Sequence, residues 1–471
     1  MPTPPPTGTP LPVRLGLLAG VAALAAVAYM VQPQIGPQGQ AACGIVCFLG
    51  LVAAFSSDLR AVNKQTILCG IALQFLLAVA VIHSDWVRGV FEVIGSGVKK
   101  LLDYSGRGGE FVFGNLAVYP DQKAVYGERT LFPFAWIALP PIIFVSGFFS
   151  VLYYFGVLQL LVRAMARVMT FLMRTSGAET LSVSANVFMG QTEAPLIVRP
   201  FVPRMTRSEL LALMASGMAH VSGGMMAVYI GYTTGYFGGD GTKAAVAILT
   251  TCVMACPCSL YLAKLMLPET ETPETLGTVR VDVEKKHVNP IDALAAGISD
   301  GLKLALNVAA MLIGFLAMIA LLNGLLGGIK PGLVWAGASA EGLAWWPDNL
   351  TLEHLLGWVF RPAAFLIGVP PDECGKVGSL LGIKLVANEH VAFLELTKNP
   401  HYADLSLRAK VLVVYALTGF ANFASVGIQL GGIGAMAESR RSDLARLGMK
   451  ALFIGFTATL VNAAVAGLLT R

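Results

Sequence analysis

Long apolar runs are the feature that most constrains how this chain can fold. They lie at about residues 15–31, 41–57, 66–83, 133–160, 209–237, 243–266, 303–327, 411–430 and 450–469. A helix needs about 20 mostly apolar residues to cross a bilayer, where its backbone polar groups must be satisfied internally. The sequence therefore predicts an all-α polytopic membrane protein with about nine transmembrane helices.

The composition supports a membrane protein. Only 13% of the 471 residues are charged and 55% are hydrophobic, whereas soluble domains carry about 25% charged residues. The net charge of +5 is spread over many short loops. That distribution fits the loop bias that orients membrane proteins better than it fits nucleic-acid binding. We therefore expect a multi-pass membrane protein, in contact with the lipid bilayer and without a nucleic-acid partner.

The seven cysteines do not indicate a disulfide framework. Most lie in apolar runs, and Cys252 and Cys256 are one helical turn apart on a predicted span. A metal site would need further ligands, and no histidine or carboxylate lies near this pair in the sequence. We expect both to be small buried side chains.

The N-terminal region begins with a proline-rich stretch that is predicted to be disordered. The run from Leu15 to Val31 lacks a strongly basic start and a cleavage site, so we interpret it as a retained helix rather than a signal peptide. Further on, Trp86, Val90 and Ile94 recur at helical spacing, with charged residues on the other face. The segment 86–104 therefore predicts an amphipathic helix at the membrane interface.

Basic residues indicate the orientation of the predicted spans. They follow the even-numbered spans and the segment 177–198, as Arg60, Lys64, Arg163, Arg167, Arg174, Arg199, Arg204, Arg207, Lys264, Arg440, Arg441 and Arg446. The positive-inside rule places all of them and the N-terminus in the cytoplasm, provided that 177–198 enters and leaves on one side. That segment is therefore predicted to be a re-entrant hairpin with its turn at Gly190-Gln191. The segment from about 352 to 397 must likewise return to its own, outer side.

Polar chemistry is concentrated at the predicted tip of the first hairpin. Gln191, Thr192 and Glu193 place a carboxamide, a hydroxyl and a carboxylate side by side, closed off by Pro195. A charged group at membrane depth costs roughly 2.5–3.5 kcal/mol on insertion scales, so it usually faces a cavity and marks a substrate or ion path. We therefore expect this triplet to bind a polar substrate.

The second predicted hairpin also carries a carboxylate, Glu389, directly after Ala387-Asn388. Two opposed hairpins, each followed by two spans, form an inverted repeat, from which secondary transporters commonly build their substrate sites. An intramembrane enzyme would need a nucleophile–base or metal-ligand set, and His220 close to Ser222 is a weak one. A channel would not concentrate its substrate. The pattern favours a transporter over both alternatives.

Three segments carry a resemblance to a known family. They are Gly190-Gln-Thr-Glu-Ala-Pro-Leu196, Val386-Ala-Asn-Glu-His-Val391 and Gly419-Phe-Ala-Asn-Phe-Ala-Ser-Val-Gly-Ile-Gln-Leu-Gly-Gly432, the last continuing into Arg440-Arg-Ser-Asp-Leu-Ala-Arg-Leu-Gly448. Over residues 40–471 the chain resembles the concentrative nucleoside transporter family. The resemblance implies a homotrimer that imports nucleosides across the bacterial inner membrane by symport, driven by a proton or sodium gradient, with elevator-like movement of a hairpin-containing transport domain. The alternative is transport of another polar small molecule, such as a free nucleobase.

The resemblance also implies a division of the chain and roles for its residues. The parts are 1–34 (disordered start and additional transmembrane helix), 35–170 (scaffold with the interfacial helix), 171–300 (first half of the transport domain), 301–345 (scaffold helix) and 346–471 (second half). Gln191, Thr192, Glu193 and Met225 should read the base, Glu389, Asn422 and Ser425 should bind the ribose hydroxyls, and Phe420 should line the pocket. The chemistry fits, because carboxylates and amides match hydroxyls and base edges.

The coupling ion, Na+ or H+, is the only cofactor expected. The family's sodium site corresponds to Asn186, backbone oxygens near Met189 and Val221, and a hydroxyl whose position is occupied here by His220. Imidazole suits a hard alkali cation poorly and titrates near neutral pH. We therefore hypothesise proton coupling at His220, or a sodium site rebuilt with Ser222. The alternative is that His220 packs between helices while the backbone oxygens still bind sodium.

Overall fold

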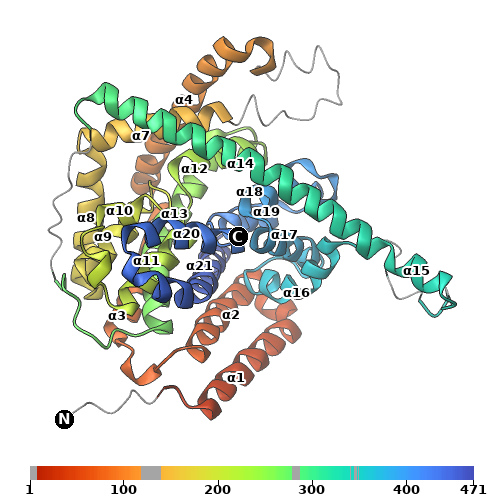
Figure 1. Ribbon diagram of the computed structural model, residues 1–471. Coiled ribbons are helices and arrows are strands. Elements are labelled where there is room, and N and C mark those ends of the chain that lie inside the picture. The colour runs from red at the N-terminus through yellow and green to blue at the C-terminus, as the bar shows by residue number, and fades with distance from the viewer. Residues whose placement is uncertain are drawn as a thin grey trace.

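The computed structural model describes residues 8–117, 139–277, 287–339, 341–343, 347 and 350–470, and the regular elements in these ranges are helices (Figure 1). They are α1 (Leu11–Met30), α2 (Gln32–Ala54), α3 (Lys64–His83), α4 (Asp85–Phe113), α7 (Leu139–Tyr154), α8 (Val157–Met173), α9 (Gly177–Ala185), α10 (Ala194–Ile197), α11 (Arg207–Ala219), α12 (Gly223–Thr233), α13 (Gly241–Met266), α14 (Pro290–Gly327), α15 (Ile329–Trp335), α16 (Leu352–Leu366), α17 (Cys374–Val386), α18 (Glu389–Lys398), α19 (Leu407–Leu417), α20 (Phe423–Met436) and α21 (Arg441–Leu469). The all-α fold is as predicted.

Most of the predicted spans coincide with helices that are long and apolar enough to cross a membrane. In the described ranges, 7 helices are long and apolar enough, or 8 if α7 and α8, which bend by 75° at their junction, count as one span. The predicted run 411–430 is interrupted by non-helical residues 418–422, so it is the two shorter helices α19 and α20. Residues 133–138 of the predicted run 133–160 lie outside the described residues.

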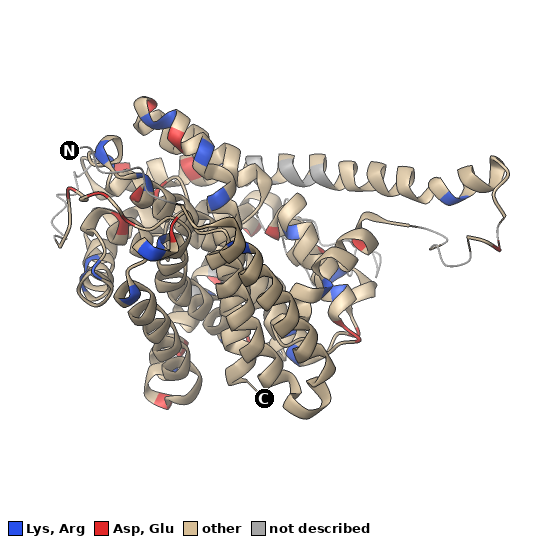
Figure 2. Cartoon of the chain, turned by 90° about the horizontal axis from the view of Figure 1, so that it is seen from below, with Lys and Arg blue, Asp and Glu red and all other residues tan. Residues whose placement is uncertain are grey.

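The most exposed helices lie at the edges of the bundle. The N-terminal helix α1 packs along α2 at one side of the bundle (Figure 1). Only 6% of the residues in its most apolar stretch are buried. The predicted amphipathic helix is confirmed as a helix and is longer, because α4 runs over 29 residues. Figure 2 shows residues of both charge signs along α4, whereas α14 carries few of them and extends away from the bundle.

Two hairpins each return to the end of the molecule from which they start. The first, residues 176–206, closes where Ser176 Oγ donates to Glu209 Oε1 (2.5 Å). The second, residues 373–406, closes where the backbone N–H and hydroxyl of Ser406 donate to the Glu373 carboxylate (2.6 and 2.7 Å). Neither segment therefore crosses the molecule.

The long helix α21 shows that the two hairpins approach from opposite ends. Its 29 residues span about 43 Å at 1.5 Å per residue. Arg207, just after the first hairpin, pairs with Asp443 at the start of α21 (3.6 Å). Arg408, just after the second, donates to the carbonyl oxygens of Gly467 (2.6 Å) and Thr470 (2.7 Å) at its far end. This is the geometry that an inverted repeat requires, while the position of the bilayer remains a prediction.

The hairpins differ in detail from the sequence expectation. In the first, α9 and the single-turn α10 flank non-helical residues 186–193, which contain the predicted turn. In the second, the break falls at residues 387–388, between α17 and α18. The predicted limits of 352–397 include α16, which is a separate helix packed along α17.

Two interrupted helices cross at their breaks. The helix formed by α11 and α12 is non-helical at residues 220–222, and the one formed by α19 and α20 at 418–422. There the Phe420 N–H donates to the His220 carbonyl oxygen (3.0 Å). Gly419 has φ +152°, and a Cβ at this position would lie 3.0 Å from the Ala219 carbonyl oxygen and 2.7 Å from Thr459 Cγ2. Glycine is therefore required for the two breaks to meet.

We expect Gly419→Ala to destabilise the protein by about 1–3 kcal/mol, the usual range for a side chain forced into a disfavoured conformation. Thermal unfolding in detergent measures the effect. Gly427→Ala is the matched control, because Gly427 lies in α20 and a Cβ there meets nothing within 4 Å. Equal melting temperatures for the two variants would contradict the role of Gly419 at the crossing.

Candidate functional site

The carboxylate of Glu389 has a hydrogen-bond donor on each oxygen. Tyr229 OH donates to Oε1 and Asn422 Nδ2 donates to Oε2, both at 3.0 Å. Asn422 also caps α20, because its Oδ1 accepts the Ser425 N–H (2.9 Å). Only 4% of Glu389 is exposed. The second hairpin, α12 and the start of α20 therefore meet at one buried acid.

The network continues from α20 to the tip of the first hairpin. Gln191 Nε2 donates to Ser425 Oγ (3.3 Å), and Gln191 Oε1 accepts from Gln429 Nε2 (3.2 Å). Gln429 Nε2 also donates to the Met214 carbonyl oxygen on α11 (2.9 Å). Residues far apart in sequence, from Gln191 to Glu389, thus form one chain of polar contacts.

Two glycines allow the first hairpin to approach this closely. A Cβ at Gly217 would lie 2.6 Å from Gln429 Nε2 and 2.9 Å from Gln191 Cβ. A Cβ at Gly432 would lie 2.5 Å from Thr192 Cγ2. Gln191 and Thr192 therefore fit directly against the glycine faces of α11 and α20.

Glu193 lies apart from this network. It is exposed to a cavity of about 460 Å³, and its Oε2 accepts the Gly190 N–H (3.0 Å). The cavity is bounded by the first hairpin, the start of α12, α7 and α14, through residues that include Ser146, Phe149, Met189, Ser222 and Asp300. Gln191, Glu389, Asn422 and Ser425 do not line it. The structure thus separates the four residues of the buried network from the carboxylate of Glu193, which faces a cavity.

The remaining predicted substrate residues lie beside the helix breaks. Met225, 2% exposed, begins α12 one turn after Ser222, whose Oγ accepts its N–H (3.4 Å). Phe420 is partly buried, and its backbone makes the contact to His220 described above. In the described part of the chain, neither side chain takes part in the hydrogen-bond network around Glu389.

Asn186, predicted to bind the coupling ion, has an unused oxygen. Its Nδ2 donates to the Ser182 carbonyl oxygen (3.2 Å) and to Ser216 Oγ (3.1 Å). Its Oδ1 is buried and has no hydrogen-bond partner among the described residues. An unpaired buried acceptor costs about 1–3 kcal/mol, and oxygen is the ligand that hard cations prefer. Val221, another predicted ligand position, is fully buried in the nearby break.

The imidazole of His220 is enclosed by neighbouring helices. Nδ1 lies 2.8 Å from the Ser216 carbonyl oxygen and Nε2 lies 3.4 Å from Cys256 Sγ. Because a carbonyl oxygen only accepts, Nδ1 carries the proton in this arrangement. No histidine lies near Cys252 and Cys256 in the sequence, but in the fold the break between α11 and α12 places His220 beside Cys256. Both cysteines are buried as predicted, and the described residues contain no metal-binding group of three or more such ligands.

Several residues of the network were not predicted from the sequence. Tyr229 lies one helical turn after Met225 on the same helix, so its spacing from a predicted site residue could have identified it. Gln429 lies one turn after Ser425 within the quoted family-like segment. His390, to which no role was assigned, is 2% exposed with its Nε2 3.4 Å from Tyr232 OH. Its place beside α12 could not be read from local sequence.

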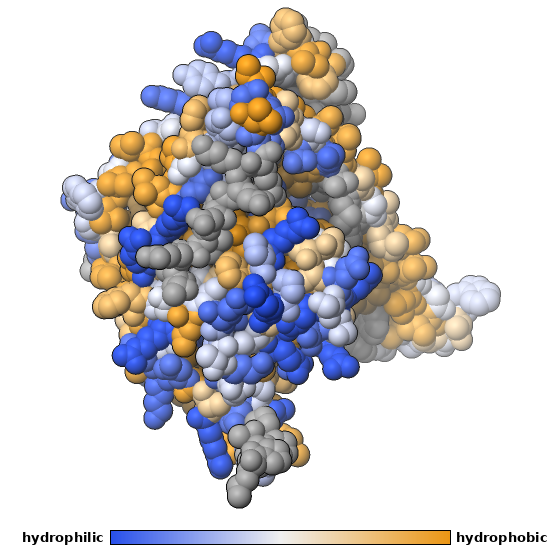
Figure 3. All heavy atoms as spheres, turned by 60° about the vertical axis from the view of Figure 1, so that its left-hand side comes forward, coloured by the Kyte–Doolittle hydropathy of each residue, from blue (hydrophilic) through white to orange (hydrophobic). Residues whose placement is uncertain are grey.

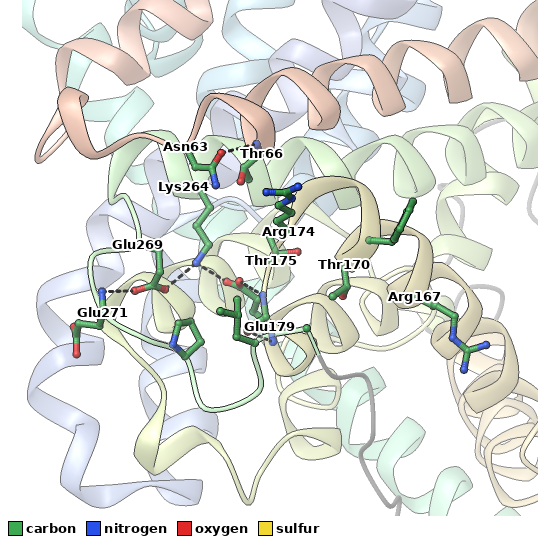
Figure 4. Close-up of a pocket in the computed structure, with 15 residues that line it drawn as sticks. Asn63, Thr66, Arg167, Thr170, Arg174, Thr175, Glu179, Lys264, Glu269 and Glu271 are labelled. Atoms are coloured by element: carbon green, nitrogen blue, oxygen red, sulfur yellow. Dashed lines mark hydrogen bonds and ion pairs between the residues drawn. The ribbon is translucent and has the colours of Figure 1, made fainter.

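A second, larger cavity lies at the base of the first hairpin (Figure 4). It encloses about 1060 Å³, and none of the predicted site residues lines it. Lys264 Nζ lies between Glu179 Oε2 (2.8 Å) and Glu269 Oε2 (3.2 Å). Through Lys264, the loop containing Glu269 is therefore held to α9 and α13. Figure 3 shows this side of the molecule, where hydrophilic side chains gather over the lower half.

Sequence profiles of one family match most of the chain. The profile described as "Na+ dependent nucleoside transporter C-terminus" matches residues 247–467, and the corresponding N-terminal profile matches 43–116. A profile described as "Nucleoside recognition" matches residues 135–237.

Related proteins and solved structures point to the same family. An uncharacterised transporter of Haemophilus influenzae is 38% identical over 429 residues, covering 90% of this chain and 96% of that protein. Sodium/nucleoside cotransporter 1 of Mus musculus is 38% identical over 440 residues, covering 90% and 63%. The structure of CNTnw in an inward-facing substrate-bound state has a TM-score of 0.81 at 37% identity, covering 91% and 97%. A substituted CNTnw in an outward-facing state has a TM-score of 0.83 at 36% identity, covering 92% and 98%.

The fold and these similarities lead to one conclusion. The chain belongs to the family of sodium-dependent, concentrative nucleoside transporters, and it is a cation-coupled membrane transporter rather than an enzyme.

Proposed function

We propose that this transporter imports nucleosides by binding them between its two hairpins. The observation that carries the proposal is the polar chain from Gln191 through α20 to Glu389. Its carboxamide and hydroxyl groups match a base edge, and a buried carboxylate with an amide matches ribose hydroxyls. Thr192, Glu193 and Met225 would complete the base contact, and Phe420 would close the pocket.

The arrangement of helices supports movement of the hairpins as a unit. Both hairpins and both interrupted helices contact α21 or one another. We assign them to a transport domain made of residues 171–300 and 346–471, which moves in an elevator-like manner against a scaffold made of 35–170 and 301–345. CNTnw has been solved in inward-facing and outward-facing states. The further elements of the proposal are a homotrimer in the plasma membrane and a cytoplasmic N-terminus.

For the driving ion, we propose sodium bound at Asn186. The support is the buried Oδ1 without a donor, next to the break that contains Val221. His220 is enclosed by Ser216 and Cys256, which favours the alternative that it packs between helices. Proton coupling at His220 is the competing outcome of the test given below.

Glu389→Gln should reduce nucleoside uptake by about 10- to 100-fold, because hydrogen bonds to a charged group contribute about 1.5–3 kcal/mol. Uptake of labelled uridine and adenosine into proteoliposomes measures the loss. Glu395→Gln is the matched control on the same helix, since the Glu395 carboxylate accepts from Asn399 outside the network. Uptake by Glu389→Gln equal to that of the control would contradict the ribose-binding role.

Glu193→Gln should also impair uptake, chiefly by weakening substrate affinity, because the carboxylate faces a cavity and not the buried network. The apparent affinity for each nucleoside, measured by direct binding to the purified protein, should fall while the melting temperature stays unchanged. Unchanged affinity for every nucleoside tested would remove Glu193 from the base-reading group.

An imposed sodium gradient should drive uptake at constant pH, and a proton gradient in sodium-free buffer should not. Asn186→Ala should raise the sodium concentration required by about tenfold, as expected for the loss of one ligand interaction. His220→Ser should restore a hydroxyl and keep or improve sodium affinity. Uptake driven by protons alone, and lost in His220→Ser, would instead assign coupling to His220.

A further inference from the structure

Lys384 is a buried cation that the proposed transport cycle does not use. It lies near the end of α17 in the second hairpin, and none of it is exposed. Its Nζ donates to the Ala416 carbonyl oxygen (2.7 Å) and to Thr459 Oγ1 (2.8 Å). Ionisable groups inside a membrane protein are costly, and by default they are functional-site candidates. Lys384 therefore requires an explanation.

The surroundings of Lys384 supply neutral oxygens and an aromatic face. Thr459 Oγ1 donates its own proton to the Phe456 carbonyl oxygen (2.8 Å), so it accepts from Nζ. The Phe456 ring centroid lies 5.3 Å from Nζ, within the range of a cation–π contact. No described ion pair joins this ammonium to a carboxylate within 4.0 Å, and the Glu389 carboxylate, whose charge interacts with it, lies beyond that distance. Carbonyl and hydroxyl oxygens around a positive charge are the surroundings of a bound cation rather than of a salt bridge.

The carbonyl that Lys384 contacts belongs to the end of an interrupted helix. Ala416 lies in the last turn of α19, just before the break at residues 418–422. The last carbonyls of a helix have no partner within the helix, and the helix dipole places partial negative charge there. The ammonium therefore neutralises and fixes the end at which α19 stops.

The first half of the chain has a matching position, which offers an oxygen atom where the second half contains a cation. Asn186 follows α9 directly, as Lys384 lies near the end of α17. Asn186 contacts Ser216 in the last turns of α11, as Lys384 contacts Ala416 in the last turn of α19. The first position offers a buried oxygen without a donor, whereas the second contains a positive charge of the chain itself.

We propose that Lys384 is a tethered cation, occupying in the second half of the chain the place that the coupling ion takes in the first. Each interrupted helix then contacts its hairpin through one positive charge. In the first half of the chain this charge is an exchangeable ion, and in the second half it is covalently bound to the chain. This limits the number of sodium ions that the protein must bind in each cycle. The comparison with the coupling ion and the limit on sodium rest on the proposed sodium coupling, whereas the role of Lys384 as a fixed cation at the end of α19 does not.

Removal of the side chain tests the proposal, since it should create a site for a small cation. Lys384→Ala removes charge and volume together, and Lys384→Met removes charge while filling the space. Both should lower the melting temperature in detergent and reduce uptake by about tenfold or more, because the Ala416 carbonyl oxygen loses its donor. Methylammonium should raise the melting temperature and uptake of Lys384→Ala alone. The Ala variant should also show a steeper dependence of uptake on sodium concentration.

Lys376→Ala is the matched control, because Lys376 lies on the same helix with its Nζ at the Asp404 carboxylate (2.6 Å) outside the core. It should respond to neither methylammonium nor altered sodium steepness. Wild-type uptake by Lys384→Met would overturn the proposal, as would a purified Lys384→Ala whose melting temperature is not raised by methylammonium. If the wild-type protein takes up no nucleoside, the proposed function fails, and the melting temperatures still decide the role of Lys384.

Discussion

The meeting of two helix breaks is the constraint on which the rest of the structure depends. Each break exposes backbone polar groups that a lipid environment cannot satisfy. The Phe420 N–H to His220 carbonyl contact satisfies part of one break with part of the other. Gly419 makes the approach sterically possible. Both hairpins then fit against this crossing, so their polar tips converge on one region of the core.

Helix α20 connects the two halves of the site. Three residues within little more than two turns make these contacts. The capping residue Asn422 donates to Glu389, the Ser425 hydroxyl accepts from Gln191, and the Gln429 carboxamide donates to Gln191. In a low-dielectric interior such bonds are strong, and an unpaired member is costly. The network therefore links the position of one hairpin to that of the other, as the proposed two-sided substrate site requires.

The two ends of the molecule are held by polar contacts of another kind. Lys264 lies between Glu179 and Glu269 at the base of the first hairpin, and Glu373 accepts from Ser406 at the base of the second. These contacts close each hairpin without involving its tip. The bases are thus fixed by contacts separate from those that hold the tips.

The sequence by itself determined the helical class, the helical amphipathic segment near residue 86, and the identity of the polar residues at the hairpin tips. Those conclusions follow from composition, apolar run length and motif, which are local properties. It did not reveal the break at residues 418–422, because an apolar run does not show that Gly419 and its neighbours leave the helical conformation. Only the tertiary structure decided that Glu193 faces a cavity while Gln191 joins Glu389, and that Lys384 meets the end of α19. The physical reason is that these partners lie on different helices, and their distances depend on how the interrupted helices cross.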